Sequence, residues 1–140
     1  MRKLFLLAGL LGTPALFLHP FGPVKEQHSN QPLAVPEKLF AKACQNCHSE
    51  KTFWPWYSYV PPVSWLVERD VSEARQHLNF SRWNEYSDEQ RREVLAKIAA
   101  EVRSKQMPPA RYQALHPEAR ISDEDIRAIY AWTKKERRQE

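Results

Sequence analysis

The two cysteines of the chain lie three positions apart and are followed at once by a histidine, in the run Cys44-Gln-Asn-Cys47-His48. Two thiols on one helical turn can reach the two vinyl groups of a porphyrin, and the next residue then places its imidazole under the iron. Thioether bonds use up both thiols, which suits an oxidising compartment. The run therefore predicts one haem c, bound covalently through Cys44 and Cys47, with His48 as the proximal iron ligand.

Other uses of a cysteine pair fit the chain less well. A disulfide between Cys44 and Cys47 would close a very short loop and stabilise little. A thioredoxin-like site needs a βαβ context, of which the sequence has no sign. A zinc site needs a second pair of ligands, and the chain has only these two cysteines.

The sixth position on the iron needs a second ligand, and Met107 is the favoured candidate. It is the only methionine after residue 1, and it stands directly before Pro108 and Pro109. A thioether is a soft iron ligand that raises the reduction potential, although many methionines only fill gaps in a core. The rival ligand is His116, whereas His77 and His28 fit capping, packing or solvent better.

Length and composition limit the remaining possibilities. A chain of 140 residues predicts one domain, and a net charge of +4 with mixed signs argues against a nucleic-acid surface. All three glycines fall within the first 22 residues, so a glycine-rich nucleotide loop is excluded from the rest. Many prolines and almost no glycine favour an all-α fold with rigid corners.

The N-terminus has the pattern of an export signal or membrane anchor. Two basic residues, Arg2 and Lys3, precede an apolar run over 4–18 that extends to residue 23, and no good cleavage site follows. An uncleaved anchor through residues 4–23 is therefore favoured over a cleaved signal. Residues 24–35 are predicted to be a linker and 36–140 a folded domain on the periplasmic side of a bacterial inner membrane.

Four helices are predicted in the folded domain. The first starts near Pro36 and runs to Ala43, and the second covers 63–78 with an apolar stripe. The third starts at Ser87 and the fourth at Ser122, each with a capping-box pattern. So small a core needs a supplement, and a large flat ligand such as haem would supply it.

Several motifs together give the chain a family resemblance between about residues 36 and 132. The chain resembles the haem-binding domain family of single-haem, cytochrome c-like proteins. The resemblance implies a compact helical cytochrome c-like domain around one haem, with Cys44 and Cys47 as covalent sites and His48 and Met107 as ligands. It departs from the family where Ala74-Arg75 stands in place of an expected Gly-Arg. The motifs are Cys44-Gln-Asn-Cys-His-Ser49, Thr52-x-Trp-Pro-Trp-Tyr-Ser58, Pro62-x-Ser-Trp-Leu66, Leu78-Asn-Phe-Ser-x-Trp83, Met107-Pro-Pro-x-x-Tyr112 and His116-Pro117.

The haem propionates need donors or solvent. The candidate donors are an indole, a phenol, a guanidinium and an amide, although packing or a solvated position is an alternative for each. They are Trp56, Tyr57, Arg75 and Asn79. Three further tryptophans, Trp54, Trp65 and Trp83, fit the core or the haem wall.

The predicted function is single-electron transfer by an exported or membrane-anchored monohaem cytochrome, between redox partner proteins that the sequence does not identify. No constellation of general acid, base or nucleophile is present, so no enzyme activity is predicted. Two alternatives stay open. One is a haem peroxidase or gas sensor with an open axial position, and the other is a haem subunit of a larger redox complex.

Overall fold

A computed structural model describes residues 37–139 of the chain, and these residues form an all-α fold. The segments predicted as anchor (1–23) and linker (24–35) lie outside the described residues. Within 37–139 no strand occurs, and no helix is both long and apolar enough to cross a membrane. The α-helices are α2 (Glu37–Ala43), α3 (Gln45–His48), α4 (Val63–His77), α5 (Asp88–Arg103), α6 (Ala110–Leu115) and α7 (Asp123–Glu136), and the 3₁₀ turns are η2 (Trp56–Tyr59), η3 (Phe80–Glu85) and η4 (Pro117–Ala119).

The four helices expected from the sequence are present as α2, α4, α5 and α7. Helices α5 and α7 begin as predicted, because Ser87 and Ser122 each form a complete capping box with the residue three positions later. Helix α4 stops at His77, where Leu78 becomes extended (φ −158°, ψ 122°). Helix α3 coincides with the helical turn expected for the Cys44–His48 run. Helix α6 was not predicted, since six residues are too few to establish a periodic pattern.

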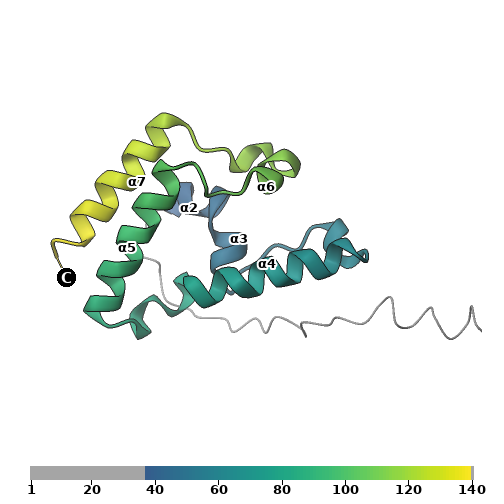
Figure 1. Ribbon diagram of the computed structural model, residues 1–140, viewed down its shortest axis with the longest axis horizontal. Coiled ribbons are helices and arrows are strands. Elements are labelled where there is room, and N and C mark those ends of the chain that lie inside the picture. Colours follow the sequence, from purple (N-terminus) through teal and green to yellow (C-terminus); the bar gives the residue numbers. More distant parts are fainter. Residues whose placement is uncertain (1–36, 140) are drawn as a thin grey trace, which may run out of the picture.

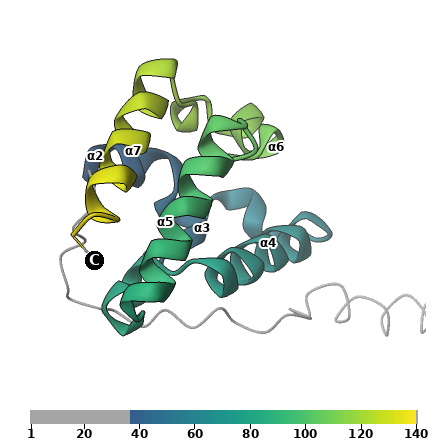
Figure 2. The same cartoon turned by 60° about the vertical axis from the view of Figure 1, so that its left-hand side comes forward.

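The helices are arranged in two groups around α3. Helices α5 and α7 lie side by side, α4 extends along the other part of the molecule, and α3 lies between them (Figures 1 and 2). Helix α6 is tied to α4 by an ion pair of 2.8 Å between Arg111 Nη2 and Asp70 Oδ2. The residues of the Cys44–His48 run therefore occupy a central position, with long helices on both sides.

The core lies where α2, η3, α5 and α7 meet, and aromatic rings dominate it. The Phe40 ring stands edge-on to Phe80 (centroids 5.1 Å apart) and to Trp132 (5.0 Å). Burying aromatic rings in this way supplies much of the hydrophobic stabilisation of a small domain. Trp83 packs against this core as expected, and Trp54 and Trp65 are half-buried outside it. The fully buried members of the cluster are Phe40, Leu78, Phe80, Val102 and Ile129.

The turn after α5 carries a residue in the left-handed region. Lys105 has φ 59°, and the amides of Gln106 and Met107 both donate to the Glu101 carbonyl, at 3.0 and 3.3 Å. Glycine is the usual residue at such a helix end, because a Cβ atom raises the energy of this conformation. The chain has no glycine after residue 22, so lysine occupies this position.

Replacing Lys105 by Gly is expected to stabilise the domain by about 1 kcal/mol, a rise in Tm of about 4–8 °C. The substitution loses the exposed ion pair with Asp123, at 3.2 Å, which contributes little. Thermal unfolding followed by circular dichroism measures the effect. Lys105→Ala is the control, since it loses the ion pair but keeps a Cβ, and its Tm should not rise. Equal Tm values for the two variants would contradict the assignment of strain to this turn.

Candidate haem site

The cysteines and the histidine lie on one short turn that follows α2 directly. The Cys44 amide donates to the Phe40 carbonyl at 2.9 Å, which continues the helical path out of α2. The amides of Cys47 and His48 both donate to the Cys44 carbonyl, at 3.2 and 3.0 Å. Residues three apart on such a turn face the same side, so both thiols can reach one flat ligand.

The hydrogen bonds of His48 decide which ring nitrogen is available to a metal. Nδ1 lies 3.1 Å from the carbonyl oxygen of Ala74 and 3.1 Å from that of Leu78. Carbonyl oxygens only accept, so Nδ1 must carry the proton and donate it. Burial lowers the pKa of His48 below its usual range, so the imidazole is neutral at pH 7. The lone pair is consequently on Nε2, the nitrogen suited to iron.

The environment of the cysteines disfavours thiolate chemistry. Burial raises the pKa of Cys44 to about 12 and that of Cys47 to about 11. Thiol–disulfide exchange requires the thiolate, which is scarce at neutral pH with such values. Among residues 37–139 no group of three or more His, Cys, Asp and Glu side chains could hold a metal ion. The redox-thiol and zinc alternatives therefore gain no support from the described structure.

Arg75 supports the segment that follows the Cys44–His48 turn. Its Nε donates to the Ser49 carbonyl at 2.8 Å, and its Nη2 donates to Thr52 Oγ1 at 2.9 Å. The Thr52 hydroxyl in turn donates to the Asn46 carbonyl at 2.6 Å, inside the turn itself. One side chain of α4 thus holds both ends of a four-residue loop next to His48. The predicted contact of Arg75 with a haem propionate stays a prediction.

A buried carboxylate, Glu50, lies two residues after His48 and was not singled out in the sequence. Its Oε1 accepts from Asn79 Nδ2 at 3.1 Å and from Arg82 Nε at 2.9 Å. The hydrogen bond to Glu50 is the main reason that the pKa of Arg82 is raised. The side-chain oxygen of Asn79, Oδ1, accepts from the backbone N–H of Ser81 at 3.0 Å. Asn79 therefore joins this loop to η3, and its predicted propionate contact stays a prediction.

Met107 lies in the turn between α5 and α6 and does not fill the core. Its side chain is 37% exposed. The reverse turn at Lys105 directs the chain away from α5, and Pro108 and Pro109 then restrict the backbone after Met107. A methionine that fills a core gap is usually buried, so core packing does not account for Met107, and its role as an iron ligand stays a prediction.

His116, the rival ligand, has both ring nitrogens engaged. Nε2 is hydrogen-bonded to the Tyr57 hydroxyl, and Nδ1 lies 2.8 Å from Glu118 Oε1. The Tyr112 ring stacks on the imidazole with centroids 4.4 Å apart, and its hydroxyl accepts from Asn46 Nδ2 at 3.0 Å. Burial raises the pKa of Tyr57, so its hydroxyl stays protonated and donates to His116. Breaking these contacts would be required before His116 could bind iron.

The two adjacent aromatic residues predicted to face the propionates lie in different environments. Tyr57 is directed toward His116, whereas Trp56 is 78% exposed. The Tyr112 hydroxyl lies beside the attachment turn, because it accepts from Asn46 Nδ2 at 3.0 Å. Tyr112, Asn46 and Glu118 were missed as members of this group, because only the fold brings residues so far apart in sequence together.

Comparison with known proteins shows the family of the chain. The haem-binding domain family matches residues 21–135, and the chain therefore belongs to that family and binds haem. It is also similar to the cytochrome c peroxidase Ccp of Escherichia coli strain K12, with 32% identity over 102 residues. That match covers 71% of this chain but only 22% of the relative, so this chain spans a small part of the relative's length. No solved structure is significantly similar.

Replacing Arg75 by Met is expected to destabilise the domain by about 2 kcal/mol or more, since it removes charge-assisted hydrogen bonds to Ser49 and Thr52. Urea unfolding measures the change in the free energy of unfolding. The matched control on the same helix is Arg69→Met. Arg69 makes only surface ion pairs of 3.6 and 3.8 Å, and its loss should cost less than about 0.5 kcal/mol.

A second variant separates these hydrogen bonds from any other effect of Arg75. Thr52→Val removes the hydroxyl that accepts from Arg75 Nη2. The loss of unfolding free energy in the double variant should then be smaller than the sum of the losses in the two single variants, because both substitutions remove the same contact. Strict additivity would show that the Arg75–Thr52 contact does not support the loop.

Proposed function

We propose that this protein carries single electrons on one haem c, joined by thioether bonds to Cys44 and Cys47 and ligated by His48 and Met107. The observation that carries the proposal is the tautomer of His48, whose Nδ1 donates to two backbone carbonyls and leaves Nε2 as the metal-binding atom. Membership of the haem-binding domain family supports haem as the bound group.

The chain's own residues would hold the haem and limit its rearrangement. When bound, the haem supplies an iron atom that alternates between the ferric and ferrous states. His48 would be kept in one orientation by Ala74 and Leu78, and the loop after it is fixed by Arg75. A ligand that cannot turn or change its protonation keeps the geometry of both oxidation states alike, which favours rapid electron exchange.

Ligation by Met107 is proposed in preference to ligation by His116. Met107 is part-exposed in a proline-restricted turn, and His116 already bonds Tyr57 and Glu118. Met107→Ala should abolish the sulfur–iron charge-transfer band in the spectrum of the oxidised protein and lower the reduction potential. His116→Ala is the matched control and should keep the band. A band lost in His116→Ala and kept in Met107→Ala would reverse the assignment.

We place the protein on the periplasmic side of a bacterial inner membrane, attached through residues 4–23. The basic start, the apolar run and the poor cleavage site support an anchor. Covalent haem attachment also suits this location, because it consumes thiols that an oxidising compartment would otherwise pair. Its electron donors and acceptors would be separate redox proteins.

A second candidate function, peroxide reduction, is favoured by the similarity to the Escherichia coli cytochrome c peroxidase. This chain matches only a fifth of that protein, so the matched region need not contain its catalytic centre. A peroxidase needs an open position on the iron, whereas a carrier has both positions filled.

Binding of carbon monoxide to the reduced protein distinguishes the two functions. As a carrier, the protein should bind carbon monoxide slowly or not at all and should not consume peroxide. Met107→Ala should bind it readily, because the variant frees one position on the iron. Rapid carbon monoxide binding together with peroxide turnover by the unmodified protein would favour the peroxidase and overturn the carrier.

A further inference from the structure

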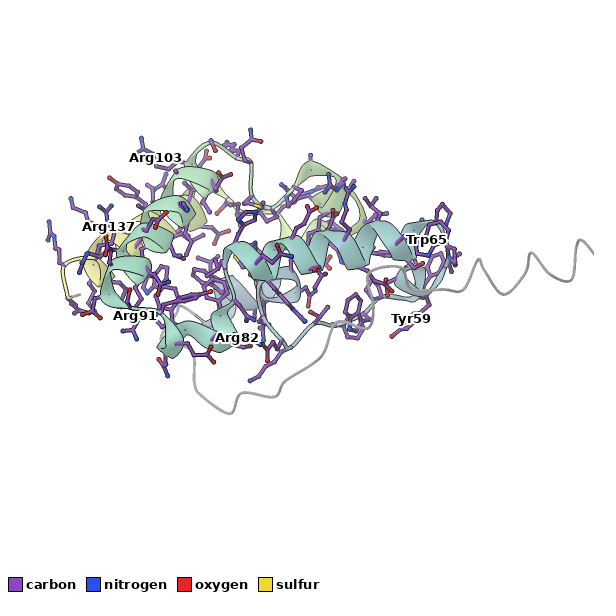
Figure 3. All side chains as sticks on the ribbon, turned by 60° about the horizontal axis from the view of Figure 1, so that its bottom comes forward. Tyr59, Trp65, Arg82, Arg91, Arg103 and Arg137 are labelled. Carbon is purple, nitrogen blue, oxygen red and sulfur yellow. The ribbon has the colours of Figure 1, made fainter. Side chains whose placement is uncertain are left out.

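Residues 52–67 form an uncharged segment in an otherwise highly charged chain. No Asp, Glu, Lys, Arg or His occurs in these sixteen positions, although 27% of the chain is charged. The segment contains η2 and the first turn of α4, and Figure 3 shows Tyr59 and Trp65 together at one end of the molecule. Arg91, Arg103 and Arg137 lie toward the opposite end (Figure 3).

The usual distribution of polar and apolar side chains is reversed at this end. Within residues 52–67 the buried residues are Ser58 and Ser64, while six large apolar residues are exposed. Tyr59, for example, is 63% exposed. Soluble proteins rarely expose contiguous apolar surface unless it meets a partner or a membrane. We call the part of this surface at the end of η2 and the start of α4 the aromatic tip. It consists of Tyr59, Val60, Val63 and Leu66, and it leaves out Phe53 and the predicted haem contact Trp56.

The buried serines beside the tip form hydrogen bonds to backbone carbonyls of the same segment. The Ser58 amide and hydroxyl both donate to the Pro55 carbonyl, at 2.9 and 2.6 Å. The Ser64 amide donates to the Val60 carbonyl at 3.0 Å. Such a surface can leave water at low cost, because these polar groups keep their partners and no charge loses its hydration.

We propose that the aromatic tip lies in the headgroup region of the phospholipid bilayer, and this inference rests on the anchored location proposed above. Tryptophan and tyrosine favour this region, since their rings are apolar and carry one polar group. The thirteen residues 24–36 between the predicted anchor and α2 span at most about 45 Å when fully extended. The tether therefore keeps the domain close to the bilayer at all times.

The position of the tip on α4 favours lipid over a redox partner. Val63 precedes Ala74, whose carbonyl accepts from His48, by eleven residues, or about 16 Å of helix. A surface for electron exchange would be expected beside the haem rather than three turns along α4. Contact through the tip would hold the domain against the membrane and leave the Arg91, Arg103 and Arg137 end free.

The test uses the full-length holoprotein in vesicles of phosphatidylethanolamine and phosphatidylglycerol that contain a phospholipid with a photoreactive headgroup. After illumination, mass spectrometry locates the labelled peptides. Labelling of residues 56–66 should exceed labelling around Leu115 by about tenfold, as expected for a side chain in the interface against one in water. Leu115 is a suitable reference because it is also 63% exposed but lies on α6.

The variant Tyr59→Ser with Val63→Ser and Leu66→Ser removes most of the tip and leaves Trp56, a predicted haem contact, in place. Its tip labelling should fall to the level around Leu115, while labelling of residues 4–23 and the haem spectrum stay unchanged. Leu115→Ser is the control and should alter neither the tip labelling nor the spectrum. An unchanged spectrum in the triple variant shows that the domain is folded.

Three results would overturn the proposal. Labelling confined to residues 4–23 would show that the domain does not touch the bilayer, and the anchored location would still stand. Labelling of the tip that falls when the protein concentration is raised, or when another protein is added, would show that the tip is a protein interface instead. Absence of all labelling would overturn both the anchor and the tip. The electron-carrier function is judged separately, from the spectra of the Met107 and His116 variants.

Discussion

The hydrogen bonds from His48 Nδ1 to the Ala74 and Leu78 carbonyls are the constraint on which the site depends. They join the Cys44–His48 turn to the last turn of α4, which places the end of that helix beneath the histidine. Leu78 turns extended at this point, and this change of direction allows its carbonyl to accept alongside that of Ala74. A longer α4 would direct the Leu78 carbonyl along the helix axis, and His48 would lose one of its two hydrogen bonds to backbone carbonyls.

The residues around this contact form a continuous polar frame on an otherwise aromatic core. Arg75 fixes the loop from one side, and Glu50 joins it to Asn79 and Arg82 from the other. Each buried polar group in the frame has a named partner, which is the condition for such a network to stabilise a fold. The described structure thus holds the attachment turn through its own protein contacts.

Local signals predicted much of the fold, and the structure shows why they succeeded. The helices that begin after Ser87 and Ser122 are specified by the capping residues themselves, which act within four positions. The spacing of Cys44, Cys47 and His48 is local in the same sense. Prediction missed α6, because a helix of only six residues is defined by its neighbours in space.

Long-range contacts limited what the sequence could say about the site. The burial of Glu50 depends on Asn79 and Arg82, about thirty positions away, and a glutamate is ordinarily exposed. The sequence leaves His116 as a candidate ligand, because nothing local shows that Tyr57, 59 positions earlier, is hydrogen-bonded to its Nε2 atom. The predicted propionate contacts of Arg75 and Asn79 depend on the orientation of the haem, which no local sequence pattern specifies.

Helix α2 has a mechanical consequence for a tethered protein. A pull on the chain ahead of residue 37 would reach α2 first. This helix ends at Ala43, directly before Cys44. There Phe40 is clamped between Phe80 and Trp132, and Lys42 Nζ holds Asp125 Oδ2 of α7 at 3.0 Å. A force applied to the chain before α2 would therefore be passed to the C-terminal helix through these contacts before it reached the attachment turn.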